Sequence, residues 1–183
     1  GLRPNIVIVY GDDRQDWRGV TMNWRSLLFV PAAAAQRWAK AHTRGADAII
    51  VDLEDSTQPE AKAAARAQAR EAVQTLHANG ATVTVRVNND PAHIEADLEA
   101  TVVKGLTAIV MPKVESASEL DGLSGMLDAL EYENRMDRYT IGVMAVIESP
   151  RALERITTIA DRPLRCRSGS RRRQLPMQRR RAA

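Results

Sequence analysis

The sequence predicts an α/β protein whose core is a parallel sheet of about five strands, each followed by a helix. Short runs of β-branched and aliphatic residues alternate with longer segments rich in helix formers, at a spacing of roughly 20 to 35 residues. Several of these runs end in charged residues, as at residues 51–55, a pattern typical of enzymes whose site lies at the strand ends. No Gly-x-Gly-x-x-Gly or Walker A motif follows any strand, so a nucleotide-binding sheet is not supported. These observations fit a TIM barrel and a doubly wound sheet equally.

The composition limits the protein to one domain, with or without a tail, because the chain has 183 residues. It is 44% hydrophobic but only 4% aromatic, so the core must consist of small and aliphatic side chains. No stretch approaches the roughly 20 apolar residues that span a bilayer, and the first residues lack the pattern of a signal peptide. The single cysteine, Cys166, excludes an internal disulfide and fits a reducing compartment. We therefore expect a cytoplasmic protein with no membrane partner.

The positive charge of the chain is confined to its end. The net charge is +3, but the residues from 162 onward hold nine of the 26 basic residues and none of the 23 acidic ones. The residues before them therefore carry about −6. We interpret residues 164–183 as a disordered, solvated tail or as the product of a shifted reading frame. The alternative is contact with nucleic acid through phosphate neutralisation.

Each predicted element has a local signal. Strands are predicted where β-branched residues dominate, including one short strand within residues 1–21, and helices where good helix formers run up to a glycine such as Gly45 or Gly80. Ser149 and Pro150 are a typical helix start. In the rest of the chain the predicted strands are 26–30, 47–53, 82–87, 106–111 and 140–147, and the predicted helices are 32–44, 59–80, 93–103, 116–133 and 150–160.

Three carboxylates close the second of these strands. Alternation predicts that Asp52 and Glu54 face one side of the sheet and Asp55 the other, unless the strand end bends. Clustered carboxylates are costly unless a metal ion or an arginine compensates their charge. Arg86, which lies between two valines in the next strand, must find an anion. That anion is either a substrate carboxylate gripped in a bidentate fashion, or Asp52 or Asp55 in a structural ion pair.

Two further charged residues follow predicted strands. Glu148 lies just before a helix start, and a carboxylate there can hold Mg²⁺, which takes one or two carboxylates plus substrate oxygens and water. Lys113 would form a Schiff base only if it were desolvated, so we expect instead an ion pair with Glu115 or a neighbouring acid. The three histidines show no ligand spacing and are assigned no role.

Five ordered motifs between about residues 23 and 163 resemble the citrate lyase β-subunit-like branch of the HpcH/HpaI aldolase family. The motifs are Arg25-Ser26-Leu27-Leu28-Phe29-Val30-Pro31, Gly45-Ala46-Asp47-Ala48 running into Val51-Asp52-Leu53-Glu54-Asp55, Val85-Arg86-Val87-Asn88, Pro112-Lys113-Val114-Glu115-Ser116 and Ile147-Glu148-Ser149. The resemblance implies a TIM (β/α)8 barrel, of which about five βα units are present. It also implies a trimer or hexamer and Mg²⁺-dependent cleavage or formation of a C–C bond next to a CoA thioester, with substrates like citryl-CoA, malyl-CoA or citramalyl-CoA.

The resemblance also implies roles for five residues. Arg86 matches the arginine that binds the carboxylate or keto-acid end of the substrate, and Glu148 matches the first Mg²⁺ ligand. Glu54 and Asp55 match acids that line the site and hold metal-bound water, and Lys40 matches a basic residue near the CoA phosphates. The implied mechanism is a retro-Claisen or retro-aldol cleavage, in which a base removes the β-hydroxyl proton and a CoA enolate leaves.

The chain departs from the family pattern in ways that bear on activity. Alanines 32–35 stand in place of an Asp-Arg or similar pair, and residues 165–168 replace the motif with the second metal ligand. Strands six to eight are absent, so we expect a truncated or frame-shifted member with an extension (1–21), a partial barrel (22–163) and a tail (164–183). Its open sheet would leave two edges unpaired, which predicts a marginal or aggregation-prone chain.

Three functions follow from these patterns. The first is a Mg²⁺-dependent lyase of 3-hydroxyacyl-CoA thioesters, impaired by the missing strands. The second is a catalytically inactive fragment, or a non-enzymatic partner of a complete paralogue. The third is a nucleic-acid binder that uses the basic tail.

Overall fold

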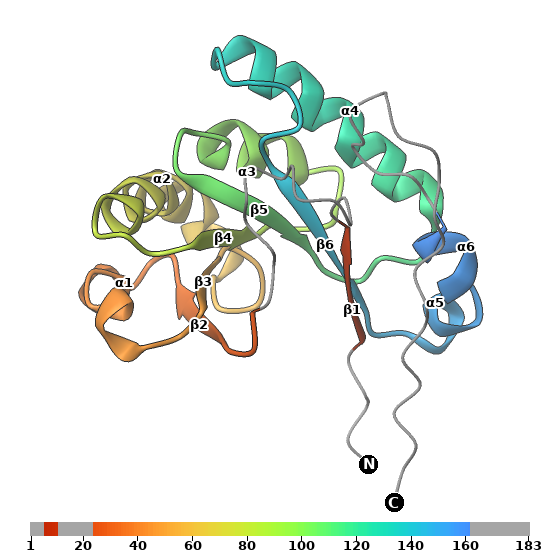
Figure 1. Ribbon diagram of the computed structural model, residues 1–183, viewed down its shortest axis with the longest axis horizontal. Coiled ribbons are helices and arrows are strands. Elements are labelled where there is room, and N and C mark those ends of the chain that lie inside the picture. The colour runs from red at the N-terminus through yellow and green to blue at the C-terminus, as the bar shows by residue number, and fades with distance from the viewer. Residues whose placement is uncertain (1–5, 11–23, 162–183) are drawn as a thin grey trace, which may run out of the picture.

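A computed structural model describes residues 6–10 and 24–161 of the chain (Figure 1). Its strands form one sheet in the order β1-β6-β5-β4-β3-β2. Neighbours from β2 to β6 run parallel and in chain order, and each of these strands is followed by a helix, as in one part of a (β/α)8 barrel. The predicted α/β class is therefore confirmed. The strands are β1 (Ile6–Tyr10), β2 (Leu27–Pro31), β3 (Ala48–Asp52), β4 (Val83–Arg86), β5 (Leu106–Met111) and β6 (Gly142–Ile147).

Three of the predicted helices are divided, and in one of them, 59–80, the 3-10 helix η2 (Pro59–Ala61) precedes the α-helix α2 (Lys62–Ala78). The segment 32–44 forms α1 (Ala35–Trp38) and the 3-10 helix η1 (Ala41–Arg44), and the buried Trp38 at the end of α1 donates from Nε1 to the carbonyl of Ala32, 3.1 Å away. The segment 150–160 divides at a non-helical residue into α5 (Pro150–Glu154) and α6 (Ile156–Ala160). The other helices are α3 (Ile94–Thr101) and α4 (Ala117–Glu133).

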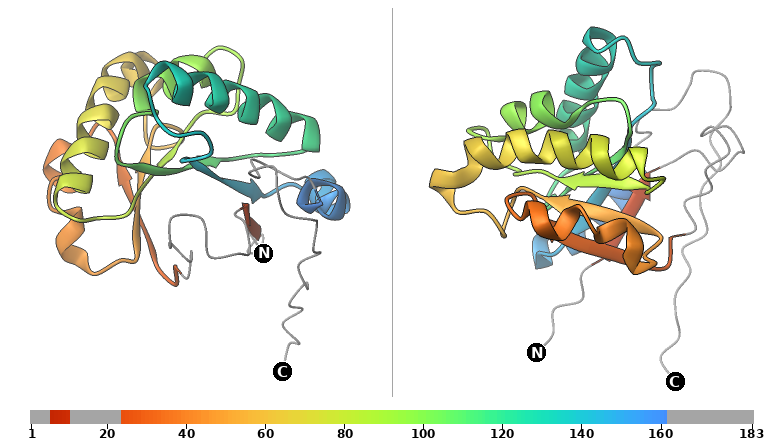
Figure 2. Two further views of the ribbon diagram at one scale, coloured as in Figure 1. Left: turned by 45° about the horizontal axis from the view of Figure 1, so that its top comes forward. Right: turned by 90° about the vertical axis from the view of Figure 1, so that its left-hand side faces the viewer.

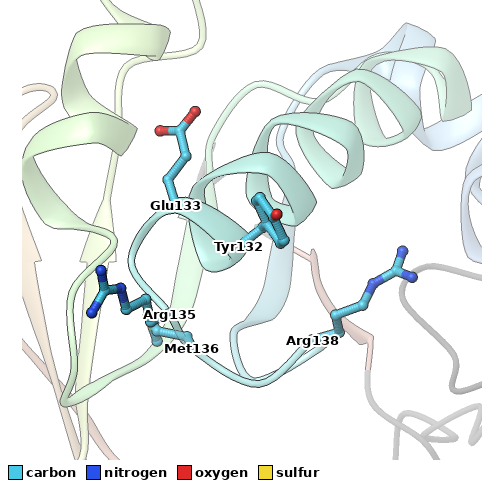
Figure 3. Close-up of a pocket in the computed structure, with 5 residues that line it drawn as sticks. All are labelled: Tyr132, Glu133, Arg135, Met136 and Arg138. Carbon is cyan, nitrogen blue, oxygen red and sulfur yellow. The ribbon is translucent and has the colours of Figure 1, made fainter.

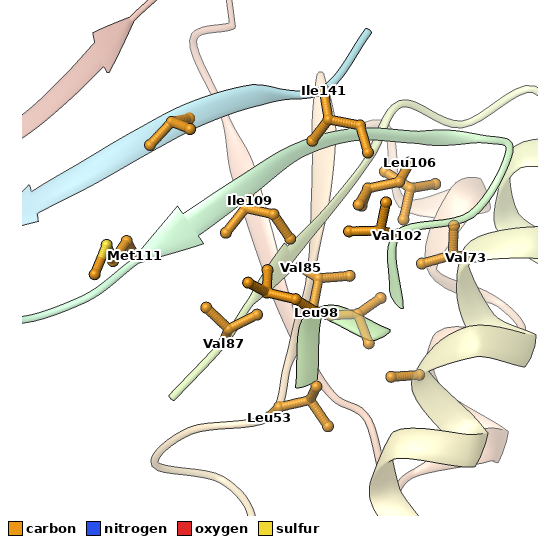
Figure 4. Close-up of a cluster of buried hydrophobic side chains, with 14 of the residues drawn as sticks. Leu53, Val73, Val85, Val87, Leu98, Val102, Leu106, Ile109, Met111 and Ile141 are labelled. Atoms are coloured by element: carbon orange, nitrogen blue, oxygen red, sulfur yellow. The ribbon is translucent and has the colours of Figure 1, made fainter. Parts of the chain in front are cut away.

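The main core lies between the sheet and the helices α2, α3 and α4, which run along one of its faces (Figures 1 and 2). Figure 4 shows Val85 and Ile109 of the strands beside Leu98 of α3 in this layer. The opposite face carries a smaller buried cluster around Ile50 and Val110. Apolar packing on both faces explains why the central strands are nearly continuous apolar runs in the sequence.

The strand β1 changes one expectation about the sheet. It pairs antiparallel with β6, with Ile6 opposite Ile147 and Tyr10 opposite Val143. The sequence predicted a short strand within residues 1–21, which is confirmed, but it did not predict that this strand joins the five strands of the partial barrel and covers the β6 edge. Within the described residues the two edge strands of this open sheet are β1 and β2. The exposed edge on the β6 side has therefore moved from β6 to β1, so the sheet still has two unpaired edges.

Two other expectations depend on which residues the structure describes. No helix within 6–10 or 24–161 is both long and apolar enough to cross a membrane. Cys166 and the basic segment 164–183 lie outside the described residues, so the expectations about them stay predictions.

Candidate active site

The sheet brings the charged strand ends together at one edge. Asp52 at the end of β3 lies directly across from Arg86 at the end of β4. The strands β3 to β6 are parallel, so the segments that follow β5 and β6 emerge at the same edge. Those segments carry Lys113 and Glu148. Residues that are up to 96 positions apart in the chain therefore form one cluster.

Arg86 lies at the centre of this cluster. Its Nε and Nη2 donate to the two carboxylate oxygens of Asp52, at 2.8 and 2.9 Å. Its Nη1 lies 3.0 Å from Glu54 and 3.5 Å from Asp55. The guanidinium also lies over the ring of Phe29, 5.0 Å from its centroid, where a cation–π contact is favourable. The structural ion pair, one of the two predicted alternatives, is therefore present, and Nη1 is the nitrogen held least firmly.

The end of β3 bends sharply, which explains how three successive acids meet one arginine. The carboxylate of Asp52 accepts the backbone N–H groups of Glu54 and Ser56, at 3.0 and 3.2 Å. This turn directs both Glu54 and Asp55 to Arg86. The expectation from strict alternation, with Asp55 on the far face, is therefore wrong, because the strand ends at Asp52 and alternation ends with it.

Lys113 joins the cluster from the end of β5. Its Nζ lies 2.6 Å from Glu54 and 3.7 Å from Asp55, and its backbone N–H donates to Glu148, 2.8 Å away. The predicted ion pair with a neighbouring acid is thus confirmed, whereas Glu115 pairs with an arginine of α5 instead. Lys113 adopts a left-handed backbone with φ 53°, which is uncommon outside glycine and turns its N–H and side chain to the cluster.

The contacts within the cluster favour the ionised forms of Asp52 and Lys113. Burial raises the pKa of the Asp52 carboxyl, but hydrogen bonds from Arg86, Ser56 and Glu54 lower it more, so this pKa lies below its usual 3.8. The hydrogen bond to Glu54 raises the pKa of Lys113 above its usual 10.5. Asp52, Glu54, Asp55 and Glu148 supply four carboxylates against the two cations, so the cluster has an excess of negative charge.

The lowered pKa of Asp52 makes the folded chain sensitive to acid. A carboxyl with a lower pKa in the folded state stabilises the fold above the unfolded pKa, and this contribution is lost as the pH falls through the folded pKa. We expect the free energy of unfolding to fall below about pH 4. Urea unfolding from pH 2 to 7 measures it, and Asp52→Asn should show a weaker dependence over the acid range. An equal pH dependence in the two proteins would contradict the assignment.

One atom of the cluster has no hydrogen-bond donor. Glu54 Oε2 is buried, and although Arg86 Nη1 is 3.0 Å away, the contact lacks hydrogen-bond alignment and is an electrostatic one. An acceptor of this kind suits a water molecule or a substrate hydroxyl. Among the described residues no three acidic, histidine or cysteine side chains can hold a metal ion together. Mg²⁺ needs only one or two carboxylates beside water and substrate oxygens, so a single carboxylate such as Glu148 is compatible with such an ion.

Lys40 lies apart from the other predicted site residues. It is exposed between α1 and η1, and within the described part of the chain no ion pair joins it to the cluster. Sequence reasoning missed the stacking role of Phe29 and two polar residues beneath the site, Lys62 and Asn88, which lie 2.6 Å apart. Lys62 did carry a signal, because it opens a helix where the dipole favours acids rather than bases.

A pocket elsewhere in the protein carries no comparable chemistry. It lies at the end of α4 and is lined by Tyr132, Glu133, Arg135, Met136 and Arg138. In Figure 3, Arg135 and Arg138 point to opposite sides and do not converge on a common point. α4 leads from the end of β5 to the start of β6, so this pocket lies at the other end of the sheet from the acid cluster.

Comparison with known proteins relates the chain to one family. A model described as HpcH/HpaI aldolase/citrate lyase matches residues 25–166. The citrate lyase subunit beta of Leuconostoc mesenteroides is 33% identical over 138 residues, which are 75% of this chain and 46% of that protein. A (3S)-malyl-CoA thioesterase of Cereibacter sphaeroides is 35% identical over 108 residues, 58% of this chain and 38% of its own length. The chain thus spans about half the length of the relatives it matches, or less.

Solved structures agree with this relationship. The citrate lyase beta subunit of M. tuberculosis, complexed with oxaloacetate and magnesium, superposes with a TM-score of 0.54 at 30% identity, over 74% of this chain and 52% of that one. A malate synthase of Haloferax volcanii superposes with a TM-score of 0.64 at 17% identity, over 76% of this chain and 46% of that one. The second match concerns the fold alone.

Proposed function

Because the chain belongs to the HpcH/HpaI aldolase/citrate lyase family, we propose that it carries half of the site of a Mg²⁺-dependent C–C lyase. Its substrate would be a 3-hydroxyacyl-CoA thioester of the citryl-CoA or malyl-CoA type. One observation carries the proposal: Arg86 is pinned on two nitrogens by Asp52, while its Nη1 faces Glu54 and Asp55 at the strand ends. A cation fixed in orientation beside available carboxylates is what charge-stabilised cleavage of a hydroxy acid requires.

The geometry suggests a role for each side chain. Arg86 Nη1 would bind the carboxylate or keto-acid end of the substrate, since its contacts to Glu54 and Asp55 are the ones a substrate can replace. Asp55 is 66% exposed and would act as the base. Glu54 is buried against Lys113, and its orphan oxygen would accept a hydrogen bond from a bound water. Lys40 would meet the CoA phosphates from outside the cluster.

The proposed reaction needs one proton and one electron pair to move. Asp55 takes the proton of the β-hydroxyl, and the bond between the hydroxyl carbon and the carbon next to the thioester breaks. The electron pair of that bond passes into the thioester as an enolate. The proton that Asp55 has taken then passes to the enolate carbon, directly or through water, so Asp55 is again a carboxylate and the products are a keto acid and an acyl-CoA. Mg²⁺ held by Glu148 would supply positive charge beside the substrate oxygens.

A second candidate is a catalytically incomplete chain that acts as a fragment or as a partner of a complete paralogue. One observation favours it. The residues from 162 onward contain no acid, so they cannot supply the second carboxylate that the family resemblance implies. The trimeric or hexameric assembly and the cytoplasmic location stay predictions.

Release of acetyl-CoA tests the two candidates against each other. The purified chain is incubated with citryl-CoA or malyl-CoA and Mg²⁺, and acetyl-CoA is measured by chromatography. We expect release that EDTA abolishes and that Glu148→Gln or Arg86→Met reduces by at least about 100-fold. Glu154→Gln, a change on α5 outside the cluster, is the control and should leave the rate unchanged. A folded chain that releases no acetyl-CoA would overturn the lyase proposal and favour the second candidate, a catalytically incomplete chain.

A further inference from the structure

A buried polar network lies beneath the turn that carries Glu54 and Asp55. Lys62, the first residue of α2, donates from Nζ to the carbonyl oxygens of Leu53 and Glu54, at 3.0 and 3.3 Å. The same ammonium donates to Asn88 Oδ1, 2.6 Å away. Lys62 therefore holds the backbone of the turn, whereas Lys113 and Arg86 hold its carboxylates.

The orientation of Asn88 is determined by its partners. Its Nδ2 donates to Asp97 at 2.6 Å and to the carbonyl of Leu53 at 3.1 Å, and its backbone N–H also donates to Asp97. An ionised carboxylate and a carbonyl only accept hydrogen bonds, so the amide nitrogen must face them. The amide oxygen is then left facing α2, where it requires a donor. Lys62 supplies that donor.

The charge of Asp97 is compensated within the same network. Asp97 is completely buried, and Arg66, one turn after Lys62 on α2, donates to it from Nε at 2.7 Å. The Asp97 carboxylate therefore accepts from one guanidinium and two amide donors, whereas Arg66 Nη2 in the same network is buried without a hydrogen-bond partner. The network therefore connects α2 and α3 to the turn after β3.

A lysine at the start of a helix needs a specific reason. The helix dipole disfavours a cation there, so Lys62 is stabilised by the three oxygens that it contacts rather than by the helix. On the other side of the turn, the carboxylate of Asp52 accepts the N–H groups of Glu54 and Ser56. The turn is therefore held from two sides, by Lys62 through its carbonyl groups and by Asp52 through its amides.

We infer that Lys62 is a positioning residue, which acts through Asn88 and the turn backbone to set where Glu54 and Asp55 stand relative to Arg86. Only the catalytic consequence of this inference rests on the proposed lyase function. The order of the turn itself does not, because it follows from the hydrogen bonds to Leu53, Glu54 and Asn88.

Hydrogen exchange of single amides tests the inference in the full chain. In Lys62→Met we expect the amides of Glu54 and Ser56 to exchange roughly tenfold faster than in the unaltered chain. Arg70→Met is the matched control: Arg70 also projects from α2 and donates to two backbone carbonyls, those of Glu99 and Ala100, away from the site. It should leave both amides unchanged. Lys62→Arg keeps the charge and should restore most of the protection.

The outcomes separate this inference from the proposed function. Unchanged exchange at Glu54 and Ser56 in Lys62→Met overturns the inference, as does an equal acceleration in Arg70→Met. Lys62→Gln, which removes the charge but keeps an amide N–H₂ group as donor, takes the place of Lys62→Met if that variant does not fold. Where acetyl-CoA is released, Lys62→Met should lower kcat with little change in KM, and Lys62→Arg should recover it. A chain without lyase activity overturns the proposed function, while the exchange measurement still decides the inference.

Discussion

Replacement of Arg86 by methionine should lower the free energy of unfolding by about 3–5 kcal/mol, the loss expected when one partner of a buried ion pair is removed. Asp52 and Glu54 are only 3% and 7% exposed, and Arg86 is their common cation. Without it, Asp52 would keep its backbone donors but lose the bidentate contact that balances its charge. Urea unfolding at pH 7 measures the effect.

Two further variants test whether the loss of stability is specific to Arg86. Arg86→Lys keeps the charge but not the bidentate geometry, so it should recover only part of the stability. Lys113→Met removes the other cation of the cluster, but that side chain is 61% exposed, so we expect a loss of less than about 1 kcal/mol. If Arg86→Met is no less stable than Lys113→Met, Arg86 is not the central cation of the cluster.

Removal of residues 1–10 should expose the β6 edge and change both stability and association. The lost strand pairs with five residues of β6, and at about 1 kcal/mol for each backbone hydrogen bond this predicts a loss of roughly 2–4 kcal/mol. The freed edge should then pair with other chains, so we expect concentration-dependent association. Thermal unfolding and sedimentation velocity measure the two effects.

The control for this deletion is a second, internal way to break the same pairing. Ile8→Pro leaves the chain length unchanged and places a residue without an N–H opposite Ala145. It should reproduce at least part of both effects, whereas removal of residues 174–183 should reproduce neither. A deletion variant that melts like the full chain and stays monomeric would show that β1 does not protect the sheet.

The Arg86 cluster and the strand β1 concern two different parts of the same sheet. The Arg86 cluster concerns the strand ends, where chemistry is proposed, and β1 concerns the side of the sheet on which a further barrel strand would follow β6. β1 runs antiparallel to β6, whereas a further barrel strand would run parallel. The described chain therefore covers its edge without continuing the barrel pattern.

The elements themselves were predictable because their signals are local. The strand at β5 was predicted with its observed bounds, and the long helices α2 and α4 within a few residues, since apolar periodicity and stop signals act over a few positions. The failures at residues 32–44 and 150–160 concern helix continuity. The first segment leaves the α-helix after the buried Trp38, and the second is interrupted by the non-helical backbone angles of Arg155.

The sequence by itself determined the α/β class, the charged strand ends and the likeness to a family of lyases. All three follow from patterns that are read along the chain. Only the tertiary structure decided that Asp52 grips Arg86 on two nitrogens, that Lys62 holds the turn below Glu54, and that β1 pairs with β6. Each of these contacts joins residues separated by a turn, a helix or most of the chain. Which residues meet depends on where each strand ends and on which sheet edges lie side by side. The periodicity of the sequence gives no information about either.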